Sequence, residues 1–170
     1  MLLNWLCFRY EKMIILHTYF QLTFVSRIKR KKIMNTRWEN CRSMVLSVLR
    51  IAAGYMFMLH GSAKLLGLPH VEMFDGLQLF SLYGVAGMLE LGGGLLVLLG
   101  LFTRPAAFIL SGQMAVAYFI GHVAGKGHAL IPFMNGGEAA ALFSFVFLYL
   151  AAAGGGKWSL DALLCKKRQG

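Results

Sequence analysis

The fold of this chain is decided by residues 79–123, which read LFSLYGVAGMLELGGGLLVLLGLF, then TRP, then AAFILSGQMAVAYFIGHV. The two apolar runs, 79–102 and 106–123, are close to the roughly 20 residues that a helix needs to cross a hydrocarbon core. Between the runs, Thr103 can cap the second helix and Pro105 suits its first turn. The stretch therefore predicts two consecutive membrane helices joined by a tight turn.

Two more apolar runs flank this pair of predicted helices. Residues 44–66 read MVLSVLRIAAGYMFMLHGSAKLL, and residues 136–153 read GGEAAALFSFVFLYLAAA. The composition agrees with a membrane protein, because 58% of the residues are hydrophobic and only 14% are charged, whereas a soluble domain carries about 25% charged residues. The sequence predicts an all-α fold, a four-helix transmembrane bundle.

The basic residues gather at the two ends of the predicted bundle and set its expected orientation. The net charge of the chain is +10. Cytoplasmic flanks of membrane helices carry an excess of lysine and arginine, so both termini are expected to be cytoplasmic in a multi-pass protein of the bacterial inner membrane. The same residues are expected to contact membrane lipid rather than nucleic acid. We expect a basic N-terminal extension (1–43), a four-span domain (44–156) and a short basic amphipathic tail (157–170).

Residues 1–33 do not fit the four-span scheme. Their apolar runs are split by Arg9, Glu11 and Lys12, so neither part reaches the length of a span. A signal peptide is not favoured, because these charges follow the first apolar run. Two interpretations stay open: an interfacial amphipathic segment, or an extension that the native protein lacks. We favour the second, with Met34 as the natural start.

Ionisable residues inside the predicted spans are the candidates for function. A charge at the centre of a membrane helix costs about 2.5–3.5 kcal/mol, so such residues usually face the bundle interior and act there. His60 and Lys64 are four residues apart and share a helix face, and Glu90 lies in the middle of the second run. With the expected topology, all five candidates converge on the outer half of the bundle. The candidate polar site is His60, Lys64, Glu90, His122 and Glu138.

Small residues on the face of Glu90 predict that this face packs closely against another helix, because they let two backbones approach. The helix-packing candidates are Gly61, Gly87, Gly93 and Gly94. Glu90 is therefore expected to point into protein, with Lys64 or His60 as its partner.

Structural roles compete with function at each candidate. Lys64 and Glu138 can extend to the interface, His122 can lie in a loop, and His60 can be a hydrogen-bonded core histidine. Glu90 can form a purely structural ion pair with Lys64 or Arg50.

Three further polar residues are expected to be structural. Arg50 by default extends to lipid headgroups, Gln113 bonds a neighbouring helix, and Arg104 lies in the turn.

No metal site is predicted. The cysteines show no C-x-x-C pair, and no His/Cys cluster has zinc spacing. His60 and His122 on different helices permit axial ligation of haem, but nothing in the sequence requires it, so haem is not favoured. From these residues alone the cofactor stays open.

The ordered set of motifs resembles the DoxX/DoxD-like family of small integral membrane proteins. The matching text is LRIAAGYMFMLHGSAKLLG, GMLELGGGLLVLLGLFTRPAA, the M-A-x-A-Y-F-I-G-H run and the closing GGGKWSLD, where Gly155 stands in place of a frequent proline. The resemblance covers about residues 45–163. It marks Arg50, Gly61, Lys64, Glu90, Gly94, Gly100, Thr103, Arg104 and Ser159-Leu160-Asp161.

The resemblance implies a membrane location and, because family names come from subunits of a thiosulfate:quinone oxidoreductase, a redox role. The first hypothesis is a quinone-linked redox subunit that acts with a soluble oxidoreductase. In it, His60, Lys64 and Glu90 meet the quinone carbonyls. The groove would be lined by Tyr55, Phe57 and Tyr118. The alternatives are a small-solute or proton-coupled transport protein and a purely structural docking subunit. The substrate, any catalytic residue and the oligomeric state stay open.

Overall fold

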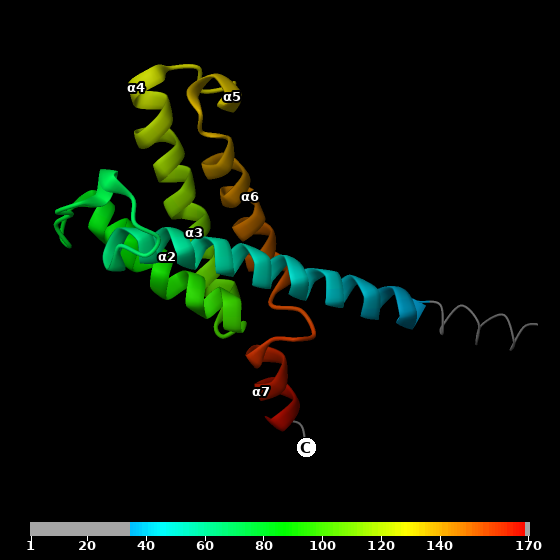
Figure 1. The fold of residues 1–170 in the computed structure, drawn as a ribbon. Coiled ribbons are helices and arrows are strands. Elements are labelled where there is room, and N and C mark those ends of the chain that lie inside the picture. The colour runs from blue at the N-terminus through cyan, green and yellow to red at the C-terminus, as the bar shows by residue number, and fades with distance from the viewer. Residues whose placement is uncertain (1–34, 169–170) are drawn as a thin grey trace, which may run out of the picture. The chain divides into compact units, whose positions relative to one another are not determined.

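The computed structural model describes residues 35–168, and all regular structure in that range is helical (Figure 1). The predicted all-α fold is confirmed. The chain divides into two compact units, Met1–Arg42 and Ser43–Gly170, and the sites below lie in the second. The interpretation of residues 1–33 concerns residues outside the described range. The long helices are Asn35–Leu66, α2 (Leu82–Leu99), α3 (Thr103–Ala117) and α6 (Glu138–Ala153).

Short helices complete the chain between and after the long ones. The third helix continues without a break from α3 through a π-helical segment into α4. The short elements are η1 (Glu72–Phe74), η2 (Tyr118–Val123), α4 (Ala124–Lys126), α5 (Pro132–Asn135) and α7 (Leu160–Arg168).

Three described helices are long and apolar enough to cross a membrane. They are Asn35–Leu66 with 32 residues, Leu82–Leu99 with 18 and Thr103–Lys126 with 24. The fourth expected span, 136–153, is present as α6 but has only 16 residues. The first two residues of the expected span lie outside α6, because Gly136 adopts the left-handed conformation and caps the end of α5. The structure thus shows three candidate spans and one shorter apolar helix.

The hydrophobic core of the second unit joins the four long helices. Phe57 lies at its centre, 1% exposed, and its ring centroid is 4.8 Å from that of Phe147 and 5.7 Å from that of Phe143. Many large apolar side chains are exposed instead, which suits helices that face lipid. The buried cluster is Ala53, Phe57, Val97, Ala106, Ala107, Leu110, Met114, Phe147 and Leu150.

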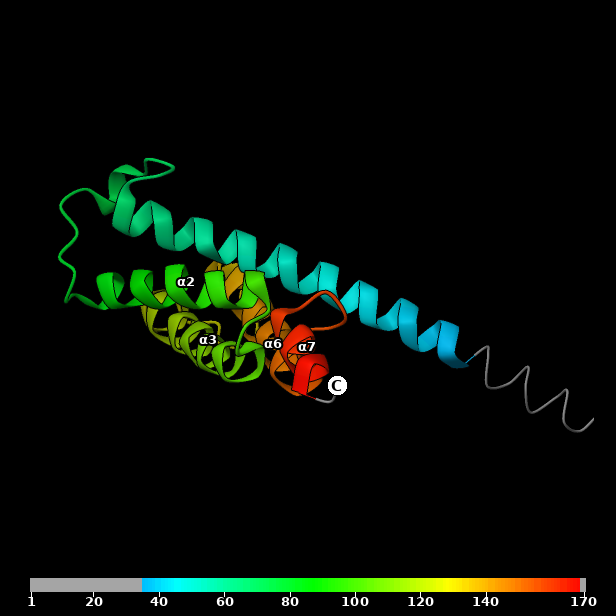
Figure 2. The same ribbon diagram turned by 90° about the horizontal axis from the view of Figure 1, so that it is seen from below.

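Glycines bring the first helix and α2 into backbone contact, and Figure 2 shows the two lying alongside each other. A Cβ atom added at Gly61 would lie 2.3 Å from the backbone N of Leu91, and one at Gly94 would lie 2.8 Å from the backbone N of Met58. No side chain fits at such distances, so the contact depends on glycine. This close approach sets the position of the polar residues that the two helices carry.

Candidate polar site at Lys64 and Glu90

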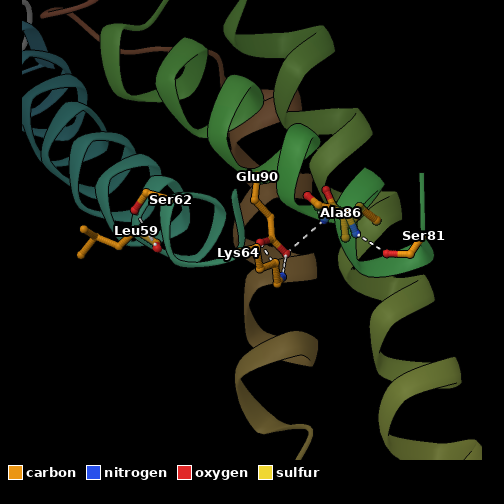
Figure 3. Close-up of polar contacts among 8 residues, drawn as sticks. Leu59, Ser62, Lys64, Ser81, Ala86 and Glu90 are labelled. Carbon is orange, nitrogen blue, oxygen red and sulfur yellow. Dashed lines mark hydrogen bonds and ion pairs between the residues drawn. The ribbon is translucent and has the colours of Figure 1, made fainter. Parts of the chain in front are cut away.

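A buried ion pair joins the first helix to α2. The Nζ atom of Lys64 lies 2.5 Å from both carboxylate oxygens of Glu90 (Figure 3). The side chains are only 12% and 3% exposed, respectively. Lys64 belongs to the last turn of a helix that ends at Leu66, whereas Glu90 lies in the middle of α2. Each charge compensates the other, which is the condition for burying either of them.

The glycines on the face of Glu90 let α2 approach the first helix closely enough for Glu90 to contact Lys64. A Cβ atom at Gly87, one turn before Glu90, would lie 3.1 Å from the Cβ of Lys64. A larger side chain beside the pair would therefore require Lys64 or Leu65 to shift. Gly93 faces α3 instead, where its Cβ atom would lie 2.7 Å from the Cδ2 atom of Leu110.

Gln113 of α3 adds a third helix to the pair. Its Nε2 atom donates to Oε1 of Glu90 and to the carbonyl of Ala86, both at 3.2 Å. Since both partners are acceptors, the amide nitrogen has to face them. The Oε1 atom of Gln113 is buried and has no hydrogen-bond partner among the described residues.

A cavity of about 250 Å³ opens beside Lys64, where the first helix meets the segment after it. Its walls include Val71, Phe74, Asp75 and Leu77. The Nζ atom of Lys64 lies 5.7 Å from the ring centroid of Phe74, within cation–π range. An ammonium carries three N–H donors, and the two carboxylate oxygens of Glu90 accept two, so one remains for a group in the cavity.

The other three candidates do not join this pair. His60 is exposed, although it lies one turn before Lys64, and it makes no hydrogen bond or ion pair within residues 35–168. The Nδ1 atom of His122 lies 3.4 Å from the carbonyl oxygen of Asn135. Glu138 is exposed at the first position of α6. The expected convergence of all five side chains is therefore not what the structure shows.

The expected aromatic groove is also different in the structure. Phe57 belongs to the core, Tyr55 is 51% exposed, and the hydroxyl of Tyr118 donates to the carbonyl of Ala129. The aromatic ring beside the ion pair is that of Phe74. It comes from the short segment after the first helix, which no span pattern singled out.

Asn135 is a buried polar residue that sequence reasoning missed. It is 0% exposed, its Nδ2 atom donates to the hydroxyl of Tyr118 at 3.2 Å, and its Oδ1 atom accepts from the backbone N of Gly137 at 2.8 Å. It holds the π-helical segment to the start of α6. The only signal in the sequence is an amide residue just before a Gly-Gly turn.

Arg50 is the second buried cation of the spans, and it satisfies backbone carbonyls. It is 1% exposed. Its Nε atom donates to the carbonyl of Gly155 at 2.8 Å and its Nη2 atom to that of Trp158 at 2.7 Å. Its Nη1 atom donates to Val97 at 2.6 Å and to Leu98 at 2.5 Å. The default expectation that Arg50 extends to lipid headgroups is wrong.

Asp161 completes this end of the structure by capping α3. Its Oδ1 and Oδ2 atoms accept from the backbone N of Phe102 and of Thr103, both at 2.9 Å. Thr103 itself begins the helix and makes no cap, so the expectation that Thr103 caps α3 is wrong. Gly100 is required here, because its φ is +71° and a Cβ atom would lie 2.5 Å from the Cβ of Ser159. Arg104 is exposed.

Within residues 35–168 no group of three or more His, Cys, Asp or Glu side chains could hold a metal ion. Cys41 and Cys165 are free and exposed. The buried polar contacts of the described residues include the Lys64–Glu90 pair, the contacts of Asn135 with Tyr118 and the Arg50 cluster. The Arg50 cluster comprises Arg50 with its four carbonyl acceptors, and Asp161 with the backbone N–H groups of Phe102 and Thr103.

This fold and site define a small helical membrane protein with a buried ion pair between its helices. The family model DoxX matches residues 45–123. An uncharacterized protein of Haemophilus influenzae is 49% identical over 131 residues, which cover 76% of this chain and 97% of that protein. The chain belongs to the DoxX family, as the resemblance implied.

Two further relatives carry names. The inner membrane protein YqjF of Escherichia coli is 32% identical over 128 residues, covering 71% of this chain and 92% of the relative. The putative oxidoreductase CatD of Bacillus subtilis is 30% identical over 125 residues, covering 72% and 88%. No solved structure matches. Most of the residues marked by the family resemblance lie at the Lys64–Glu90 pair, in the Arg50 cluster or on the glycine contact between helices, whereas Arg104 and Leu160 are exposed.

Proposed function

We propose that this DoxX protein binds the ring of a quinone beside Lys64 and acts as a membrane subunit for a soluble oxidoreductase. In this proposal it is a multi-pass protein of the bacterial inner membrane, with α6 as a short fourth span and both termini cytoplasmic. The apolar helices support a lipid environment, and one relative is named an inner membrane protein. Another is named a putative oxidoreductase, which supports the redox role.

The observation that carries the proposal is a buried ion pair with a cavity on one side. Because Glu90 neutralises Lys64, the pair presents no net charge, and a neutral acceptor such as a carbonyl oxygen suits it better than an anion. The remaining N–H of Lys64 can donate to that oxygen. The lining of the cavity is mixed: Val71, Phe74 and Leu77 lie there beside the polar side chains of Lys64 and Asp75. The cavity volume of about 250 Å³ is close to the lower end of ligand pockets, about 300 Å³, and so suits a single ring.

The chemistry of a quinone fits the donors that are present. Reduction of a quinone to a quinol takes two electrons and two protons. The electrons come from the soluble oxidoreductase, since the proposal gives this chain no carrier of its own, and the two protons come from solvent water. Lys64 stabilises the negative charge that develops on the carbonyl oxygen, which is how fixed donors favour such a step. Glu90 and Gln113 hold the ammonium in place.

The test combines extraction with a binding titration. The protein purified in mild detergent is extracted with organic solvent and the extract is analysed for quinones. The quinone-free protein is then titrated with short-chain ubiquinone and menaquinone analogues. We expect Glu90→Gln to fold, because glutamine keeps the shape and most hydrogen bonds, but with lower stability, because Lys64 loses its charged partner. We expect it to bind at least about tenfold more weakly, a loss of about 1.4 kcal/mol.

The matched control is Glu138→Gln, which removes an exposed carboxylate from the start of α6 and should leave the affinity unchanged. An extract without quinone together with no saturable binding would refute the proposal. Equal affinities for Glu90→Gln and the unaltered protein would refute the role of the pair.

A purely structural docking subunit is the competing function. The observation that favours it is that Lys64 and Glu90 already satisfy each other without any ligand. In that case the pair only locks the first helix to α2. Binding of the soluble partner would then be independent of quinone and would survive any Lys64 and Glu90 replacement that keeps the fold.

A further inference from the structure

The last helix, α7, carries apolar side chains that the protein does not cover. Leu163 and Leu164 are 63% and 53% exposed, and Leu160 is 38% exposed. Trp158, just before the helix, is 52% exposed. An exposed apolar face of this kind marks a surface that contacts a membrane or another molecule, because contact between apolar side chains and water is unfavourable.

The exposed charged residues next to this apolar face are lysines. Lys157, Lys166 and Lys167 are exposed. Asp161 is the single acidic residue between Gly154 and the end of the sequence, and its carboxylate is turned toward the backbone N–H groups at the start of α3. The occupant is therefore expected to be anionic as well as apolar.

The hydrogen bonds of the Arg50 cluster fix where this face lies. The carbonyl of Trp158 accepts from Arg50 and its backbone N donates to Ser47. The backbone N of Asp161 donates to the carbonyl of Gly100 at 2.9 Å. Since α2 ends at Leu99 and α3 begins at Thr103, α7 is held at the ends of two membrane-crossing helices, where hydrocarbon gives way to headgroups.

We propose that α7 with Trp158 is a docking surface for anionic phospholipid in the bilayer that holds the protein. Leu160, Leu163, Leu164 and the indole contact the upper acyl chains, a position that tryptophan favours. The lysines pair with the phosphodiester groups of lipids that carry net negative charge. This surface is independent of the quinone proposal, because it involves neither Lys64 nor Glu90.

The test uses quenching of Trp158 fluorescence by brominated lipid in the full chain. The sequence has three tryptophans, so Trp5→Phe with Trp38→Phe leaves Trp158 as the reporter. The protein is placed in vesicles of equimolar phosphatidylcholine and phosphatidylglycerol, with either one or the other lipid brominated. We expect stronger quenching when phosphatidylglycerol carries the bromine.

The charge dependence is tested with Lys166→Gln combined with Lys167→Gln, which should abolish the difference between the two brominated lipids. High salt should reduce it. The matched control is Lys126→Gln, which removes an exposed lysine of α4 and should keep the difference. Equal quenching by both lipids in the unaltered chain would overturn the preference for anionic lipid. No quenching by either would overturn the membrane contact itself and would indicate a protein partner on this face.

Discussion

Replacing Arg50 with lysine keeps the positive charge and removes the shape of the guanidinium. In the structure four backbone carbonyls accept from Arg50, and they belong to Val97, Leu98, Gly155 and Trp158. Arginine has five N–H donors spread over a planar fork, whereas lysine has three at one point. At least one carbonyl must therefore lose its partner, and a buried acceptor left unsatisfied costs about 1–3 kcal/mol.

The expected result is that Arg50→Lys lowers the free energy of unfolding by at least about 1–3 kcal/mol. Replacement by alanine leaves all four carbonyls unpaired, a cost of about 4–12 kcal/mol by the same count. That loss is comparable with the entire stability of a typical domain, about 5–15 kcal/mol. We therefore expect Arg50→Ala not to accumulate in the membrane.

The assay is denaturant unfolding in detergent micelles followed by circular dichroism. The matched control is Arg104→Lys, the same chemical change at an exposed residue that makes no hydrogen bond within residues 35–168. It should change stability by less than about 0.5 kcal/mol. If Arg50→Lys unfolds at the same denaturant concentration as the unaltered protein, the four hydrogen bonds do not stabilise the fold as argued here.

Three further predictions concern helix contacts and caps, each read from the same unfolding measurement. Gly61→Ala should lower the free energy of unfolding by about 1–3 kcal/mol through overpacking, because its Cβ would meet the backbone of Leu91. The control Gly92→Ala places its Cβ in open space and should raise the free energy of unfolding by up to about 1 kcal/mol. Equal effects of the two substitutions would contradict the close approach of the helices. Lys64→Met should lower the free energy of unfolding by about 3–5 kcal/mol, because it leaves Glu90 unpaired, and adding Glu90→Leu should restore most of that stability. A double variant as unstable as the single one would show that the two charges are not coupled. Asp161→Asn keeps one acceptor oxygen, so it should cost about 1 kcal/mol, and an unchanged midpoint would argue against the cap on α3.

The sequence was informative where hydrophobicity and residue size decide the outcome. Runs of apolar residues placed the long helices, and small residues near Glu90 indicated a packed face. The positions of the ionisable residues suggested Lys64 or His60 as the partner of Glu90, and the structure shows that the partner is Lys64. The family resemblance was confirmed by the match to the DoxX model.

The partners of Arg50 could not be predicted from the sequence. They are backbone carbonyls, which every residue has, so no side chain in the sequence marks them. The partners of the Asp161 carboxylate are also backbone groups, in this case N–H groups at the start of α3, 58 residues earlier in the chain. Spacing alone also failed to separate His60 from Lys64. They were expected to share a face, yet Lys64 contacts Glu90 whereas His60 is exposed.

Helix boundaries were the least predictable feature. The fourth run was expected to start at residue 136, but the left-handed Gly136 ends α5 and α6 begins two residues later. The π-helical turn at Tyr118–Val123 was hidden inside an apolar run that contains no proline. A π-helical turn inserts one extra residue into the helical repeat, and that shift is invisible to a pattern based on 3.6 residues per turn.

The Arg50 cluster has a consequence for the order in which the protein is made. Ribosomal synthesis proceeds from the N-terminus, so the guanidinium enters the membrane with the first helix, before any of its four acceptors exists. The acceptors at Val97 and Leu98 arrive with α2, and those at Gly155 and Trp158 arrive only after α6 has been made. Until then the nascent chain carries a half-satisfied cation. The bundle can therefore close fully around Arg50 only once the segment that follows α6 has been made.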